Sequence, residues 1–261
     1  MIPLPTINIG DLNVTRLICG GNPFSGNSHQ TYERDLEMRD FYTVARIKQT
    51  LRECEQVGIN TLLARADSHI KRMLVEYWSE GGTIQWIAQT AYEWRSLHDN
   101  IIGMAQTGAK AAFIQGTTVD EMFLDGRIDE LAPLLDLIHS AGMPAGIGSH
   151  IPRVIRYVEE KGWDPDFYII SFYDVITHDE SYLEEDRAEA VKLIREIERP
   201  CIAIKVLAAG RNNPEAAFRF AFENIKPCDA IAVGTYWKER PDEMRKNAEL
   251  CRALGSVFSK V

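Results

Sequence analysis

Short apolar runs alternate with longer amphipathic segments along almost the whole chain. The runs have the length of strands and carry few polar residues, which is typical of strands covered on both faces. The predicted strands span residues 16–19, 60–64, 83–88, 111–114, 144–147, 167–172, 201–206 and 229–233.

The segments between these strands have helical periodicity, and Val57-Gly58 ends the first of them with the glycine that commonly follows a helix. The stretch between the first strand and the first helix is rich in Gly, Asn and Ser and is predicted to be a loop. The predicted helices span 42–56, 69–78, 93–106, 119–139 (as one or two helices), 152–161, 182–198, 214–224 and 241–258.

Eight strands in strict alternation with helices predict an α/β fold with a parallel sheet, because each strand must return through a helical crossover. The chain has 261 residues, and a (β/α)8 TIM barrel needs roughly 250. We therefore expect one barrel domain over residues 1–261. The alternative is a doubly wound open sheet, but Gly20-Gly21-Asn22-Pro23 lacks the G-x-G-x-x-G spacing, and no G-x-x-x-x-G-K-[ST] motif is present.

Charge and cysteine content narrow the function classes. The formal net charge of −9 disfavours nucleic acid as a partner, since acidic surfaces repel phosphate backbones. The five cysteines form no C-x-x-C pair, so we expect no disulfide framework and a reducing, cytoplasmic setting. No apolar run approaches the ~20 residues that span a bilayer, and the N-terminus lacks a signal-peptide pattern. The partner we expect is a small-molecule substrate, and a homo-oligomer is compatible with this composition.

In a barrel of this kind the chemistry lies just after the C-terminal ends of the strands. The candidates there for catalysis are His69, His150, Asp67, Asp174 and Lys205. Imidazoles and carboxylates gathered on one face suit acid/base chemistry. The same residue types suit a divalent metal, for which His69, His150 and Asp174 are the predicted ligands. The alternative is that these histidines and carboxylates only cap loops on the surface.

Lys205 lies in an otherwise apolar strand, where a lysine needs a partner or a polar cavity. It could bind an anion, act as an amine base or nucleophile, or only form an ion pair. Other strand-end residues are candidates for binding hydroxyls, a carboxylate or a ring, with packing and structural ion pairs as the alternative. These residues are Asn22, Arg65, Gln89, Gln115, Tyr173 and Tyr236.

Several segments resemble the aldo/keto reductase superfamily, in order along the chain. The opening residues 7–21 are similar to that family's N-terminal hairpin and first strand. Gly58-Ile59-Asn60 resembles its entry to strand two, Gly148-Ser149-His150 its turn after strand five, and residues 204–210 its strand-seven motif. Gly234, followed by residues 243–247, is similar to its last strand and helix. The resemblance implies a barrel preceded by a short hairpin.

The resemblance also implies NADPH-dependent carbonyl reduction by an Asp, a Tyr, a Lys and a His. This sequence departs from that set at every position. The aspartate falls near Leu63 or Ala64, the tyrosine at Ser68 or His69, the lysine near Gln89 and the histidine near Gln115.

We therefore expect an enzyme that kept the barrel and performs acid/base chemistry on a sugar- or keto-acid-like metabolite. An isomerase, an epimerase and a lyase all fit, with or without a divalent metal. The first alternative is an NADPH-dependent oxidoreductase with a rearranged acid such as His69. The second is a catalytically inactive, ligand-binding barrel.

Overall fold

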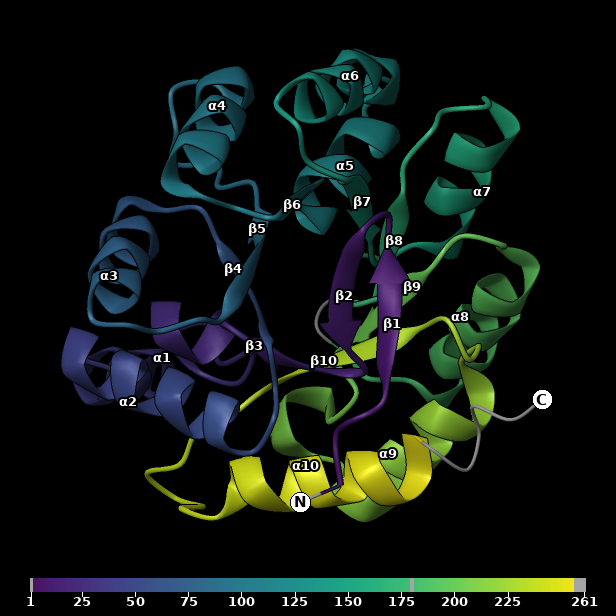
Figure 1. Ribbon diagram of the computed structural model, residues 1–261. Coiled ribbons are helices and arrows are strands. Elements are labelled where there is room, and N and C mark those ends of the chain that lie inside the picture. The colour runs from purple at the N-terminus through teal and green to yellow at the C-terminus, as the bar shows by residue number, and fades with distance from the viewer. Residues whose placement is uncertain (1, 179–180, 256–261) are drawn as a thin grey trace.

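A computed structural model describes residues 2–178 and 181–255. Eight parallel strands close into a barrel in the order β10-β3-β4-β5-β6-β7-β8-β9, with helices packed around the outside (Figure 1). The strands are β3 (Leu17–Gly20), β4 (Thr61–Arg65), β5 (Gln85–Gln89), β6 (Ala111–Ile114), β7 (Ala145–Ser149), β8 (Phe167–Ser171), β9 (Cys201–Ile204) and β10 (Ala230–Gly234). The predicted α/β barrel and its eight strands are confirmed.

The helices follow the strands as the sequence pattern predicts, with one addition. They are α1 (Tyr32–Phe41), α2 (Val44–Gln56), α3 (Ser68–Ser79), α4 (Leu97–Thr107), α5 (Gly116–Leu124), α6 (Ala132–Ser140), α7 (Pro152–Glu160), α8 (Glu184–Glu196), α9 (Pro214–Asn224) and α10 (Glu243–Gly255). Three 3-10 turns join them, η1 (Asn22–Ser25), η2 (Ile128–Leu131) and η3 (Ala208–Gly210).

Helix α1 occupies a stretch that the sequence pattern assigns to a loop. Its residues are mostly charged and only Met38 and Phe41 are buried, so it carries almost no apolar periodicity. What begins it is a local cap, since the side chain of Thr31 accepts a hydrogen bond from the backbone N–H of Arg34.

Other boundaries differ for similarly local reasons. The predicted helix 93–106 begins only at Leu97, because Ser96 caps it by accepting a hydrogen bond from the N–H of Asp99. The predicted helix 119–139 divides into α5, η2 and α6. The end of the predicted helix 241–258 lies outside the described residues beyond position 255.

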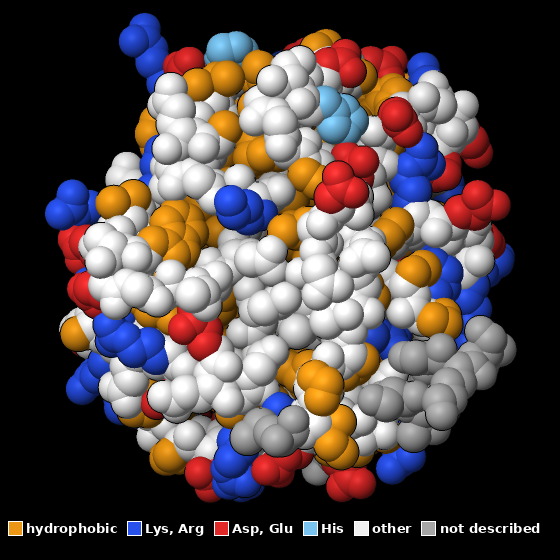
Figure 2. Space-filling view, in the orientation of Figure 1, with side chains coloured by type: hydrophobic (Ala, Val, Ile, Leu, Met, Phe, Trp, Pro, Cys, Tyr) orange, Lys and Arg blue, Asp and Glu red, His pale blue; other side chains and the backbone are white. Residues whose placement is uncertain are grey.

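An antiparallel hairpin, β1 (Thr6–Ile9) and β2 (Leu12–Thr15), precedes the barrel and lies across its N-terminal end in Figure 1. Its apolar face, with Ile7, Ile9 and Val14, joins one buried cluster with strand residues such as Ile18 and Phe113. Viewed from this side, acidic and basic side chains are interspersed around the rim (Figure 2). The hairpin therefore closes this end, and only the opposite end is left for a binding site.

A second and larger apolar cluster fills the layer between the strands and the surrounding helices. Within the described residues, no helix combines the length and apolarity needed to cross a membrane.

Candidate active site

A cavity of about 510 Å³ opens at the C-terminal ends of the barrel strands. Every strand contributes to its wall, and this is the end at which (β/α)8 barrels bind their substrates. The contributions from the strands are Gly20, Leu63, Gln89, Phe113, Gly148, Ile169, Ile204 and Ala232. The volume suits a small metabolite.

His150 follows β7 and lines this cavity with its side chain only 10% exposed. Its Nδ1 lies 2.8 Å from the Oδ2 atom of Asp120, a residue of α5 that is fully buried. The same carboxylate oxygen accepts the backbone N–H of His150 at 3.0 Å, and Oδ1 accepts the hydroxyl of Ser149. The imidazole is thus held through Nδ1 and through its own backbone.

Glycines allow α5 to approach β7 this closely. A Cβ atom on Gly116 would lie 3.1 Å from Cε1 of His150, and a Cβ on Gly148 would lie 3.1 Å from the backbone nitrogen of Gly116. Both distances are shorter than most Cβ contacts, so a side chain at either position would push α5 and β7 apart, and the two glycines favour the contact between Asp120 and His150.

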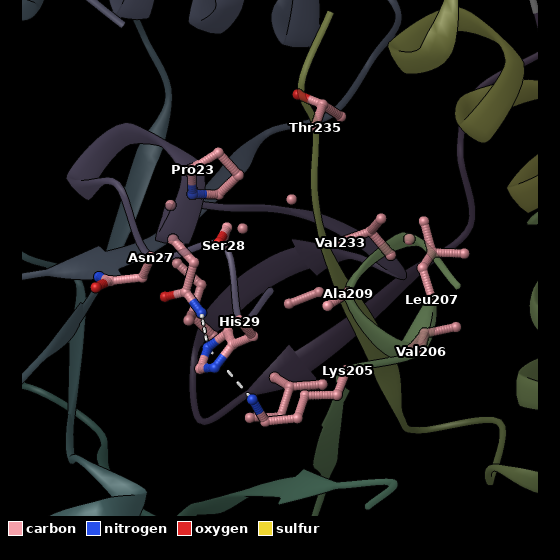
Figure 3. Close-up of a pocket in the computed structure, with 18 of the residues that line it drawn as sticks. Pro23, Asn27, Ser28, His29, Lys205, Val206, Leu207, Ala209, Val233 and Thr235 are labelled. Carbon is pink, nitrogen blue, oxygen red and sulfur yellow. Dashed lines mark hydrogen bonds between the residues drawn. The ribbon is translucent and has the colours of Figure 1, made fainter. Parts of the chain in front are cut away.

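Lys205 and His29 point toward each other in the cavity (Figure 3). The Nζ atom of Lys205 and the Nδ2 atom of Asn22 each lie 3.3 Å from Nε2 of His29. Both neighbours are donors, so Nε2 of His29 is the acceptor that they share.

The backbone at this cluster is unusual. His29 and Lys205 have φ angles of 54° and 58°, in the left-handed region that non-glycine residues seldom adopt. β9 therefore ends at Ile204, one residue before Lys205, whereas the sequence pattern extends the strand to residue 206. Conformations of this kind are held by their surroundings and concentrate at functional sites.

Three further predicted binding residues come from β4, β5 and the end of β6. Arg65 and Gln89 end β4 and β5, and Gln115 follows β6; all three line the cavity. The guanidinium of Arg65 pairs with Glu93 and lies over the ring of Tyr92, 4.8 Å from its centroid. Gln115 also caps α5, since its Oε1 accepts the backbone N–H of Thr118 at 3.0 Å.

The acidic groups of the cavity wall come from the segment that follows β10. Among the described residues, Glu239 and Glu243 are the only acidic side chains in the wall. Glu239 pairs with Arg34 across the mouth, and Glu243 pairs with Arg240 and accepts the backbone N–H of Tyr236 at 3.1 Å. Burial raises the pKa of Glu243.

Tyr236, predicted to bind substrate, also lines the cavity but mainly packs against other rings. Its ring meets that of Phe41 edge to face at 5.4 Å, and the guanidinium of Arg34 lies over it.

The structure does not bring Asp67 and His69 into the cavity. The candidate catalytic roles of both residues depend on their reaching the barrel mouth, but β4 ends at Arg65 and α3 begins at Ser68. Asp67 caps that helix by accepting the N–H of Ile70 at 2.7 Å, and His69 is exposed on its first turn. The carboxylate is therefore committed to a structural hydrogen bond, and neither residue is part of the cavity wall.

Asp174 and Tyr173 also lie outside the cavity wall. Asp174 accepts hydrogen bonds from the backbone and hydroxyl of Thr177. Tyr173 is buried, and its hydroxyl accepts a hydrogen bond from Asn212 at 2.9 Å.

The predicted metal ligands His69, His150 and Asp174 do not come together. In the part of the chain that the structure describes, no group of three or more His, Cys, Asp or Glu side chains has the geometry to hold a metal ion. Of the three, only His150 lines the cavity, whereas His69 lies on the first turn of α3 and Asp174 accepts hydrogen bonds from Thr177.

Two residues of this site are missing from the predicted set. His29 follows the first strand in a loop, and nothing in the neighbouring sequence predicts that its ring lies beside Lys205. Asp120 lies within the predicted helix 119–139 beside Val119, and an acid in the apolar half of an amphipathic helix is the signal that could have identified it.

No protein-family model matches the sequence, and no curated protein matches it. Solved structures do match in fold. A candidate aldo-keto reductase from Pseudomonas aeruginosa has a TM-score of 0.64 at 15% identity, covering 95% of each chain. An aldo-keto reductase from Bacillus halodurans, in its holo form, has a TM-score of 0.59 at 12% identity, covering 98% of this chain and 97% of its own.

A truncated 3-deoxy-D-arabino-heptulosonate 7-phosphate synthase from Thermotoga maritima matches comparably, with a TM-score of 0.58 at 13% identity, covering 98% of this chain and 92% of its own. At these identities the likeness concerns the fold: this chain has an aldo-keto reductase-like barrel, and the same architecture is shared by enzymes of different reaction classes.

Proposed function

We propose that this protein is an enzyme that transfers protons on a small hydroxylated metabolite, a sugar or a keto acid, as an isomerase, an epimerase or a lyase. The observation that carries the proposal is that two basic side chains that follow different strands, His150 after β7 and Lys205 after β9, line one cavity. Removing a proton from one atom of a substrate and returning it to another requires groups placed in this way.

The remaining lining residues support this substrate class. Gln89, Gln115 and Asn22 are neutral amides that can donate to and accept from hydroxyl groups without adding charge. Lys205 supplies positive charge, whereas the acidic side chains of the wall are paired with arginines. A hydroxylated substrate with a carbonyl or carboxylate group fits this distribution better than an amine does.

The residues present do not fit the NADPH-dependent alternative. Leu63, Gln89 and Gln115 stand in the cavity wall where the resemblance implies an aspartate, a lysine and a histidine, and none of them titrates. His69, the suggested substitute acid, is exposed outside the wall. The backbone N–H of Tyr236, near the start of α10, is already taken by the carboxylate of Glu243. We derive no hydride step for this protein.

Proton exchange with solvent is the test. A panel of sugars, sugar phosphates and keto acids is incubated with the protein in D2O, and loss of carbon-bound protons is followed by 1H NMR. An isomerase, an epimerase or a lyase of this kind exchanges such a proton during turnover. Once a substrate is found, His150→Gln and Lys205→Met should each lower exchange by roughly 100-fold or more.

His98→Gln and Lys246→Met are matched controls, since both residues are exposed on helices and neither lines the cavity. Full exchange in His150→Gln and Lys205→Met would overturn the proposal. Tight NADPH binding, seen as a change in reduced-cofactor fluorescence, would favour the reductase instead. Tight ligand binding without exchange of any panel compound would favour the inactive barrel.

A further inference from the structure

The carboxylate of Asp120 has no route to the substrate, because its side chain is fully buried beneath His150. It nevertheless accepts three hydrogen bonds, from the hydroxyl of Ser149, from the backbone N–H of His150 and from the ring of His150. A buried carboxylate is costly unless it is satisfied in this way. Its position therefore needs an explanation in terms of the groups that it holds.

The ring contact decides which tautomer His150 adopts. An ionised carboxylate only accepts hydrogen bonds, so the Nδ1 atom 2.8 Å from Oδ2 must carry a proton. In the neutral ring, Nε2 is then left with its lone pair. With Nδ1 and the backbone fixed against α5, the ring cannot turn over without breaking the contact with Asp120.

We infer that Asp120 is a positioning residue that makes Nε2 of His150 the proton acceptor of the cavity and stabilises the imidazolium formed when it takes a proton. A carboxylate that accepts from one ring nitrogen increases the basicity of the other and fixes the ring orientation. This inference rests on the proposed function for its catalytic meaning, whereas the tautomer itself is a property of the protein alone.

The first test needs no substrate. Full-length protein labelled with 15N-histidine is studied by long-range 1H–15N NMR at about pH 8.5, where an ordinary imidazole with a pKa of about 6.5 is neutral. His150→Gln identifies the resonances of His150. We expect a protonated Nδ1 and an unprotonated Nε2. A protonated Nε2 in the wild-type protein would overturn the inference, whatever the enzyme turns over.

The second test separates positioning from a merely structural role. Diethyl pyrocarbonate acylates an unprotonated imidazole nitrogen, so its rate at His150, followed by peptide mass spectrometry, reports the reactivity of Nε2. Asp120→Asn keeps the size of the side chain and removes its charge, and we expect the rate to fall severalfold. Asp136→Asn, at an exposed position on the neighbouring helix α6, should leave the rate unchanged.

An unchanged rate in a folded Asp120→Asn protein would contradict the inference. If Asp120→Asn does not fold, the tautomer of His150 in the wild-type protein, measured by NMR, tests the inference alone. The two proposals can fail separately: loss of exchange in His150→Gln tests the function, and the tautomer tests the role of Asp120.

Discussion

Arg16 is fully buried at the N-terminal end of the barrel, far from the candidate active site, and its removal should cost stability without altering the cavity. Its guanidinium donates to the backbone oxygens of Asp229 at 2.8 Å, Gly255 at 2.9 Å and Lys226 at 3.0 Å. It also lies over the ring of Phe222. These contacts join the start of the first barrel strand to the last strand and the last helix.

The expected magnitude follows from these hydrogen bonds. Arg16→Met keeps much of the apolar stem but leaves the three carbonyl oxygens without this donor, at about 1.5 kcal/mol each, or roughly 4.5 kcal/mol together. Burial lowers the pKa of Arg16, which means that the fold pays for holding its charge. Methionine removes that cost, so the net loss is smaller than the sum of the lost hydrogen bonds. The net loss of unfolding free energy should be about 3 kcal/mol.

Urea denaturation followed by circular dichroism and tryptophan fluorescence measures this loss. In thermal melts it corresponds to a fall in Tm of roughly 6 to 12 °C for a chain of this size. Arg245→Met is the matched control, because Arg245 is about half exposed and pairs with two exposed carboxylates, Asp242 just before α10 and Glu249 on it, so its loss should be within about 0.5 kcal/mol. A loss below about 1 kcal/mol for Arg16→Met, at an unchanged m-value, would refute the reasoning.

Two further predictions concern the walls of the cavity. Gly21→Ala would place a Cβ atom 2.5 Å from Cβ of Ala64, so the first two barrel strands must separate. Urea denaturation should show a loss of unfolding free energy of about 2 to 3 kcal/mol. A loss under about 0.5 kcal/mol would contradict the close approach. Because burial raises the pKa of Glu243, the native state holds that proton more tightly than the unfolded chain, and the resulting stability is lost as pH rises through the native pKa. Glu243→Gln does not titrate, so its stability relative to wild type should improve as the pH rises above the ordinary pKa of a glutamate, about 4.3. A constant difference would show that burial does not govern this carboxyl.

The strands and most helices could be predicted from the sequence because their signals are local. An apolar run such as 111–114 or 167–171 records burial on both faces, and the alternation with amphipathic segments implies parallel strands. Helix α1 escaped prediction because two buried residues, Met38 and Phe41, are too few to produce a periodic pattern.

The residues of the candidate site also differ in whether a local sequence signal places them. Residues directly at strand ends, such as Gln89 and His150, could be placed at the mouth of the barrel from the sequence, since the register of parallel strands puts them there. Asp67 and His69 could not, because the choice between continuing a strand and capping a helix depends on one hydrogen bond to the N–H of Ile70.

What only the tertiary structure decided is which side chains meet. Lys205 and His29 are separated by 176 positions in the chain, and Asp120 and His150 by 30. No local pattern records such distances, because the energy of each contact arises between elements that the barrel brings together from different turns of the chain. The sequence by itself determined the barrel and the end at which its chemistry lies. Closure of the barrel and the packing of α5 against β7 determined that the ring of His150 contacts the buried carboxylate of Asp120.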